Sequence, residues 1–334
     1  MKLKILDRGY VSETDSLIPG NIVRNNKIFV SLNTDGDISS GQRLRLMVSR
    51  IDSMKFEEIE LNFSSVFHNG GLEAGCSISE GDENRIFLPY SDAHYINREK
   101  TLDRKALVFC PWSDDEGKTW NSSKALDVEN YEAFAYGKIL KTGNKLKMPI
   151  WGSKYQGGKW ESGYLQSYDN GQTWCDYRTI CKMCNETVIE NYRGGIVALI
   201  RGYGIWYSGH EEVSIKSEHD PKPLHMIVDS GDGISVPPTF SGIRGTAPSL
   251  YRVSDSILLS GSRSIRPGGG CVLSVFSEDT EKFSEILELK VPTGEWRYGG
   301  YPVISSIDKS TLFVTFHHMH ENRWCCSWNI VEIS

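Results

Sequence analysis

Short runs of apolar or alternating residues recur along the chain, and segments rich in Gly, Asp and Ser separate them. Residues 106–109 (ALVF) and 163–166 (GYLQ) are two such runs, and each lies just before a turn-like segment. Runs of about four to eight residues with this pattern are typical of β-strands. No long amphipathic helical pattern, linker or low-complexity stretch interrupts them. The pattern therefore predicts one all-β domain over residues 1–334.

An eight-residue motif occurs twice, with its two copies 54 residues apart. Residues 113–120 (SDDEGKTW) and 167–174 (SYDNGQTW) both read S-x-D-x-G-x-T-W. Asp and Gly are turn residues, because the carboxylate binds local backbone N–H groups and Gly readily adopts a positive φ. A repeat period of about 50 residues indicates a propeller or another repeat architecture.

Weaker copies of the motif extend the repeat along the chain. They are residues 49–56 (SRIDSMKF), 229–236 (DSGDGISV) and 277–283 (SEDTEKF). The five copies fill five blades, and the two chain ends supply a sixth if residues 2–6 (KLKIL) pair with residues 327–333 (SWNIVEI). Such closure removes exposed sheet edges. The sequence thus predicts a six-bladed β-propeller, with Trp120 and Trp174 buried beneath equivalent turns.

The composition narrows the partners and the compartment. Hydrophobic residues make up 39% of the chain and charged residues 24%, as in soluble globular proteins. The net charge is −6 and no basic run is present, which argues against nucleic acid but leaves room for a small anionic ligand. Residues 1–15 lack the apolar stretch of a secretory signal, and no membrane-spanning segment is visible. We expect a cytoplasmic protein, or a secreted one if a signal was removed.

The cysteines and histidines give no strong metal signal. Eight cysteines are spaced irregularly, which favours buried reduced thiols, and the C-x-x-C at residues 181–184 has no second pair. His318 and His320 alternate along a strand, and we expect them at the rim of a polar pocket rather than as a metal pair. The sequence therefore predicts no metal and no cofactor.

The repeated motif resembles the Asp boxes of the sialidase superfamily, which also occur in non-catalytic propellers. Function must therefore come from other residues. Sialidases carry a Glu at the start of one strand and an Arg at the end of the next, and Glu186 and Arg201 are similarly placed, fifteen residues apart. The resemblance implies that Glu186 is a general base and that Arg201 is one arm of a carboxylate clamp.

Two further segments carry the resemblance toward the C-terminus. Arg266, in the segment RPGGGCVLS, resembles another clamp arginine, and Arg263 competes for that role. Tyr301, in residues 299–303 (GGYPV), stands in a context similar to that of the sialidase nucleophile. The resemblance implies that Tyr301 attacks the substrate.

The N-terminal quarter departs from the sialidase pattern. Sialidases have an Arg-Ile-Pro segment there, whereas residues 16–19 read SLIP and place Leu17 where the arginine belongs. A neutral aliphatic side chain cannot bind a carboxylate, so another arginine reaches the site or the substrate is not a standard sialoside; the possible substitutes are Arg8, Arg24, Arg43 and Arg45. The resemblance also implies an acid/base Asp in this region, either Asp35 or Asp37, of which we prefer Asp37.

These residues suit glycoside chemistry at an anomeric carbon that carries a carboxylate. A neutral tyrosine avoids the like charge that a carboxylate nucleophile would meet, and a base removes its proton as the bond forms. The resemblance implies a retaining, sialidase-like glycosidase acting on a sialic or other nonulosonic acid. A non-catalytic glycan-binding propeller and an enzyme for another acidic sugar, including one with lyase chemistry, stay open. A hydrogen bond between Glu186 and the Tyr301 hydroxyl, faced by Arg201 and Arg266, would favour the enzyme.

Overall fold

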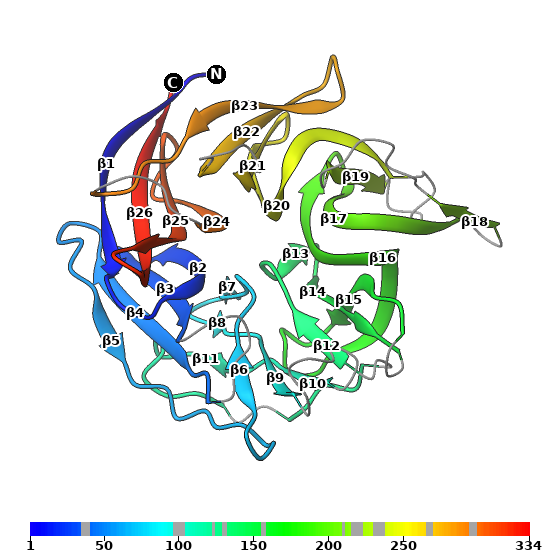
Figure 1. Cartoon of the computed structure of the whole chain (residues 1–334), viewed down its shortest axis with the longest axis horizontal. Helices are drawn as coiled ribbons and strands as arrows, with labels where there is room; N and C mark the ends of the chain where they lie inside the picture. The colour runs from blue at the N-terminus through cyan, green and yellow to red at the C-terminus, as the bar shows by residue number, and fades with distance from the viewer. Residues whose placement is uncertain are drawn as a thin grey trace.

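The computed structural model describes most of the chain as β-strands joined by turns (Figure 1). The described residues are 1–34, 41–95, 104–121, 124–128, 132–154, 158–208, 211–214, 223–229, 238–264, 270–293 and 299–334. Every helix or strand assigned within these ranges is a strand, so the predicted all-β class is confirmed. Within the same ranges, no helix is long and apolar enough to cross a membrane.

The two ends of the chain meet in one four-stranded sheet, with the strand order β1-β26-β25-β24. Its strands are β1 (Leu3–Ser12), β24 (Gly299–Ser306), β25 (Thr311–His320) and β26 (Arg323–Ile333). Leu3 lies opposite Ile333, and the antiparallel pairing continues to Ser12 opposite Cys326. The two termini accordingly lie side by side in Figure 1. The predicted pairing of the chain ends is confirmed, and β1 covers what would otherwise be an open edge of β26.

Two small sheets follow β1 along the chain. The first has the order β2-β3-β4-β5 and consists of β2 (Leu17–Arg24), β3 (Lys27–Asn33), β4 (Leu44–Arg50) and β5 (Glu57–Ile59). The second has the order β11-β8-β7 and consists of β7 (Ser79–Glu80), β8 (Ile86–Phe87) and β11 (Trp112–Ser113).

The other strands form one long hydrogen-bonded series from β6 to β23. Its first members are β6 (Gly71–Glu73), β9 (Tyr90–Tyr95), β10 (Arg104–Phe109), β12 (Glu132–Ala135), β13 (Leu140–Thr142), β14 (Lys145–Ser153) and β15 (Glu161–Ser167). The series continues through β16 (Cys175–Tyr192), β17 (Gly195–Ser208), β18 (Glu211–Ser214), β19 (Pro223–Asp229), β20 (Thr239–Ser254), β21 (Ile257–Ser264), β22 (Cys271–Ser277) and β23 (Lys282–Glu288).

Two long strands link neighbouring groups within this series. Residues 175–182 of β16 pair with β15, and residues 184–192 of the same strand pair with β17. In β20, the first residues pair with β19 and residues 245–254 pair with β21. Each strand therefore passes from one group of strands to the next without a break in hydrogen bonding.

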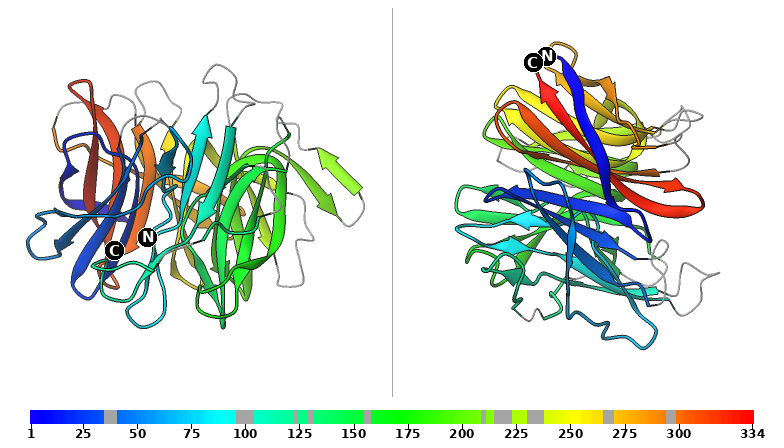
Figure 2. Two further views of the ribbon diagram at one scale, coloured as in Figure 1. Left: turned by 90° about the horizontal axis from the view of Figure 1, so that it is seen from below. Right: turned by 90° about the vertical axis from the view of Figure 1, so that its left-hand side faces the viewer.

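The sheets stand around a common centre in Figure 1, and Figure 2 shows the strands running through the thickness of this ring. Among the described residues, hydrogen bonding groups the strands into four sheets rather than six separate ones. The all-β architecture is therefore established, whereas the division into six blades stays a prediction.

The two motif copies form the same turn. In the first, Ser113 Oγ accepts the Gly117 N–H at 2.8 Å, and Asp115 Oδ1 accepts the Thr119 N–H at 2.8 Å. The second copy repeats both bonds, with Gly171 N–H to Ser167 Oγ at 2.8 Å and Thr173 N–H to Asp169 Oδ1 at 2.9 Å. Both glycines have a positive φ, 85° and 80°, as the turn requires.

The tryptophans of the two copies differ in burial. Trp174 is buried and meets Phe87 edge-on at 6.4 Å, whereas Trp120 is half-buried against Phe63 at 5.7 Å. The burial predicted for both is thus met by Trp174 and only in part by Trp120. Of the weaker copies, residues 49–56 connect β4 to β5 and residues 277–283 connect β22 to β23, and those that follow Asp229 lie outside the described residues.

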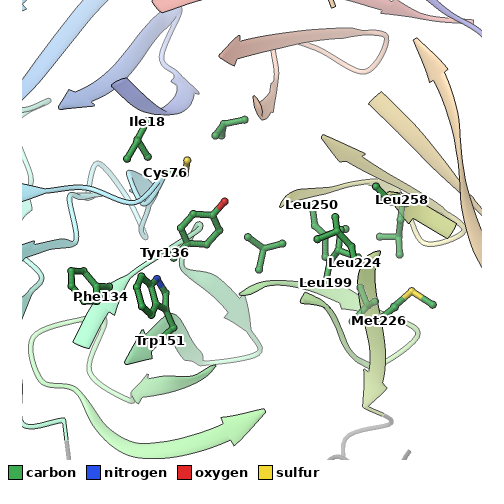
Figure 3. Close-up of a cluster of buried hydrophobic side chains, with 14 of the residues drawn as sticks. Ile18, Cys76, Phe134, Tyr136, Trp151, Leu199, Leu224, Met226, Leu250 and Leu258 are labelled. Carbon is green, nitrogen blue, oxygen red and sulfur yellow. The ribbon is translucent and has the colours of Figure 1, made fainter. Parts of the chain in front are cut away.

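A large apolar cluster borders the centre of the ring. Figure 3 shows Ile18, Cys76, Tyr136 and Leu250 pointing toward this centre from different parts of the chain. Tyr301 is half-buried and packs against the cluster. Because strands far apart in sequence converge there, the cluster fixes the positions of the residues that border it.

Candidate active site

Tyr301 and Glu186 meet beside the central cluster although they are 115 residues apart in sequence. The Tyr301 hydroxyl donates a hydrogen bond to Glu186 Oε1 at 2.7 Å. Glu186 is only 7% exposed, so the bond lies in a place with little water. The contact expected from the sequence between the proposed base and nucleophile is present.

A β-bulge places each member of the pair. The register of β24 on β25 shifts between Gly300 and Val303, and that of β16 on β17 shifts between Asn185 and Thr187. Tyr301 also has a φ of 56°, which costs a bulky residue of order 1–3 kcal/mol. Bulges redirect side chains from the regular alternation of a strand, so both side chains are set by local backbone irregularities.

Arg201 completes the group. It lies opposite Asn185 in the pairing of β17 with β16, and its Nη1 forms an ion pair with Glu186 Oε1. Burial is the largest single influence on the pKa of Arg201 and lowers it, but the charges of Glu186 and Tyr301 and the hydrogen bond to Glu186 together raise that pKa above its usual value. The guanidinium therefore holds a full positive charge next to the Tyr301–Glu186 contact.

The second oxygen of Glu186 is an unusual feature of the site. Oε2 is buried and has no hydrogen-bond partner among the described residues. A buried acceptor without a partner costs about 1–3 kcal/mol, and in a native protein such an atom marks a place for a ligand or an ordered water. The site therefore offers an acceptor that the protein itself leaves unsatisfied.

The other predicted site residues are placed less completely. Arg263 lies in β21 beside the strand of Tyr301, because a Cβ on Gly300 would meet its Cδ at 3.1 Å. Arg266, Asp37 and its alternative Asp35 lie outside the described residues, so their roles stay predictions.

The four arginines that could replace the missing one either have other contacts or have exposed side chains. Leu17 is 5% exposed and packs in the central cluster. Arg45 forms an ion pair with Glu58, and Arg24 donates to the carbonyl groups of Gly81 and Arg85. The remaining two possibilities, Arg8 and Arg43, have exposed side chains. Leu17 therefore adds an apolar side chain to the cluster against which Tyr301 packs.

Two residues beside Tyr301 were missed by the sequence analysis. Tyr136 approaches its ring edge-on at 6.2 Å, and the His317 ring lies 5.4 Å away. Burial, followed by the charges of Arg263 and His318, lowers the pKa of His317 to about 3. The neutral ring accepts the Ile18 N–H at Nδ1 (2.9 Å). The FHHMH run at residues 316–320 was a signal, but alternation alone did not show that His317 faces the centre.

The other chemical candidates have structural contacts. His318 is fully buried and its Nε2 bonds Ser327 Oγ at 2.8 Å. The Cys184 thiol donates to the Cys181 carbonyl at 2.9 Å. Within the described ranges, no group of three or more His, Cys, Asp or Glu side chains could hold a metal ion.

Comparison with known proteins gives no match to a protein-family model or to a curated protein. Among solved structures, a protein of unknown function from Dyadobacter fermentans DSM 18053 has a TM-score of 0.79 at 16% identity, with 99% of each chain covered. The Trypanosoma rangeli sialidase has a TM-score of 0.68 at 12% identity, over 96% of this chain and 55% of its own. The NanB sialidase from Streptococcus pneumoniae has a TM-score of 0.64 at 13% identity, over 100% of this chain and 71% of its own.

These identities establish a shared fold and nothing finer. The chain spans about half the length of the Trypanosoma rangeli sialidase. The protein has an all-β, sialidase-like fold.

Proposed function

We propose that this protein is a retaining glycosidase that acts on an acidic sugar, with Tyr301 as nucleophile and Glu186 as general base. The observation that carries the proposal is the 2.7 Å hydrogen bond from the Tyr301 hydroxyl to Glu186, with Arg201 ion-paired to the same carboxylate. The proposal includes a single sialidase-like domain of six blades, in which the repeated turns are Asp boxes.

The chemistry follows from these contacts. Glu186 takes the phenolic proton as the Tyr301 oxygen bonds to the anomeric carbon, and Asp37 protonates the leaving oxygen. Water then attacks the glycosyl–tyrosine bond, and the same groups run in reverse. Arg201, together with Arg263 and Arg266, binds the carboxylate of the sugar, because guanidinium groups pair with carboxylates through two parallel hydrogen bonds.

The solved neighbours agree with such chemistry without demonstrating it here. One structure of the Trypanosoma rangeli sialidase is described as a complex with 2,3-difluorosialic acid, a covalent intermediate. A covalent intermediate is the step for which Tyr301 is proposed in this chain.

Leu17 favours a second candidate on the same scaffold, an enzyme for an acidic sugar other than an ordinary sialoside. Its side chain is buried and apolar at the position where the resemblance requires an arginine. A carboxylate placed against the Leu17 side chain would lose hydrogen bonds to water without recovering them. The identity of the sugar is therefore the first thing to test.

The test is a panel of aryl glycosides of nonulosonic and uronic acids, with release of the aryl group and binding measured separately. Wild type should turn over at least one compound, and Tyr301→Phe should lose that turnover by about a thousandfold or more while keeping its fold. Binding of one compound without turnover of any would show a non-catalytic glycan-binding protein. Equal activity of wild type and Tyr301→Phe would show that the assigned mechanism is wrong.

A further inference from the structure

A cavity separate from the Tyr301–Glu186 pair lies among the inner strands of the ring. It has a volume of about 320 Å³ and is lined from β2, β7, residues 137–140, β16, β20 and β24. Its lining includes Cys76, whose buried thiol is close enough to Glu186 to feel that charge, but neither Glu186 nor Tyr301. Glu80, which also lines it, is exposed, so the cavity reaches solvent on that side.

Lys138 is the one lysine or arginine among the residues that line this cavity. Its Nζ donates to the Ile304 carbonyl and to Ser305 Oγ, both at 2.7 Å. No carboxylate of the described residues lies within ion-pair distance, and Glu80 and Glu190 act on the amine only from farther away. A half-buried amine held by two neutral acceptors is therefore fixed in position without a charge partner.

The surroundings change the chemistry of this amine. Burial lowers the pKa of Lys138 to about 8, against the opposing influence of Glu80 and Glu190. Burial also raises the pKa of Glu190, whose Oε1 accepts the Asn191 N–H at 2.8 Å. A lysine and a carboxyl group with pKa values moved toward each other are the usual partners in amine addition to a carbonyl.

We propose that Lys138 forms a Schiff base with a small neutral aldehyde or ketone that enters the central cavity. The volume is at the lower end of small-molecule sites, which start at about 300 Å³. The charge of the lining favours a neutral compound, because Glu80 and Glu190 would repel a phosphate or a carboxylate. This site is independent of the glycosidase proposal.

The reaction balances without an oxidant or a reductant. The neutral Nζ adds to the carbonyl carbon and a C–N bond forms, while the Glu190 carboxylate passes one of the two Nζ protons to the carbonyl oxygen. The carbinolamine then loses water as the nitrogen gives up its proton, so that amine and carbonyl become imine and water. The hydrogen bonds to Ile304 and Ser305 hold Nζ while it reacts.

Among the described residues that line the cavity, four groups besides Lys138 can ionise. They are Glu80 from β7, Glu190 from β16, Tyr251 from β20 and Cys76 from the segment before β7. β2 and β24 contribute only neutral side chains to the lining. The pH dependence of the reaction should therefore follow Lys138 itself, rising from pH 6 and levelling above about pH 8.

The experiment uses pyridoxal as the probe, with cyanoborohydride to trap the imine and peptide mapping to locate it. Lys141 is the internal control, because it lies three residues away, is half exposed and pairs with Asp82. At pH 7.5 Lys138 should be labelled on the order of tenfold or more faster than Lys141, because a lower pKa leaves more neutral amine. Glu190→Gln should slow labelling at Lys138 and leave Lys141 unchanged.

Three results would overturn the inference. If Lys138 is labelled no faster than Lys141, its amine is not activated. If Lys138 is labelled only after the protein unfolds in urea, its amine is structural and serves to hydrogen-bond β24. If Glu190→Gln leaves the Lys138 rate unchanged, Glu190 does not relay the proton. Tyr301→Phe should leave labelling unchanged, which separates this site from the glycosidase proposal.

Discussion

The turn at residues 167–174 and the Tyr301–Glu186 pair differ in how their carboxylates are satisfied. Asp169 accepts hydrogen bonds on both oxygens, from the backbone and hydroxyl of Thr173 and from Ser167. Glu186 receives both of its partners on Oε1, and its buried Oε2 has none among the described residues. The turn carboxylate is complete within the protein, whereas the site carboxylate is not.

The two regions also differ in the type of residue that adopts a positive φ. The turn uses Gly171 where a positive φ is needed, and glycine takes that conformation at no steric cost. The site has Tyr301 in a positive-φ conformation, which is sterically unfavourable for a bulky side chain. The region that repeats in sequence thus builds the scaffold, and the region that breaks local rules is the better candidate for function.

Glu186→Gln should have the largest effect, because it removes the base and keeps the shape. The amide oxygen can still accept the Tyr301 hydroxyl but cannot take its proton. We expect kcat/KM to fall by about 10²–10⁴-fold on the best substrate, with the protein still folded by thermal unfolding.

Glu278→Gln is a matched control for this change. Glu278 accepts a hydrogen bond from Tyr192 and pairs with Arg193, so it repeats the Tyr–Glu–Arg set elsewhere on the molecule. Its substitution should leave turnover unchanged. Similar losses in both variants would mean that Glu186 acts through stability and not as a base.

Asp169→Ala should have the opposite effect: it should lower the free energy of unfolding and leave turnover unchanged. It removes the bonds to Thr173 and Ser167, and we expect the free energy of unfolding to fall by about 1–3 kcal/mol. Turnover per folded molecule should be unchanged. The measurement is urea unfolding beside the exposed Asp127→Ala as control.

The same variant has a defined pH dependence. Burial raises the pKa of the Asp169 carboxyl group, but its hydrogen bonds together outweigh burial. The pKa of Asp169 therefore lies below 3.8 in the folded protein. A lowered carboxyl pKa gives stability that is present above the unfolded value and is lost as pH falls through the folded value. The gap between wild type and Asp169→Ala should therefore close below about pH 4, and a gap that persists unchanged to pH 2 would contradict this account.

How much of this could be read from the sequence depends on how local each feature is. The turns of residues 113–120 and 167–174 are short-range and repeat, so the motif predicted them, and the pairing of the chain ends followed from the need for closure. Glu186 and Tyr301 were found only through the resemblance to sialidases. Nothing in their spacing shows that two bulges, 115 residues apart, bring them together.

Features that depend on distant packing were not predictable. Tyr136 and His317 border Tyr301 because strands from different parts of the chain converge on one cluster. Lys138 acquires its surroundings from β24, more than 160 residues later. The joining of strand groups through β16 and β20 depends on where long strands bend, which alternation of residues does not encode.

His317 should make the site sensitive to acid. Its pKa is lowered to about 3 in the folded protein, against 6.5 for the free side chain, so the unfolded chain binds more protons between these values. Stability should then fall as pH falls from 6.5 toward 3, by up to about 1.4 kcal/mol per pH unit from this residue. His317→Gln should remove this component in urea unfolding at pH 7 and pH 5. The exposed His68→Gln should keep the full slope, and equal slopes in all three proteins would show that His317 is not the cause.

The smallest expected effect tests whether positive φ angles belong to the site or to the scaffold. Ile18 in β2, Ala247 in β20 and Tyr301 in β24 all have φ near 50°, and each lies at a register shift.

Ala247→Gly loses a buried methyl group but relieves a left-handed residue, worth about 1–2 kcal/mol. Ala198→Gly, equally buried in β17, loses a similar methyl and also about 0.5–1 kcal/mol of strand backbone entropy. Ala247→Gly should therefore be near neutral and more stable than Ala198→Gly by roughly 1–2 kcal/mol in urea unfolding. This result would show that the scaffold sets the strained conformation at several strands and that Tyr301 occupies one of these positions. Equal destabilisation by both substitutions would instead confine the strain to Tyr301.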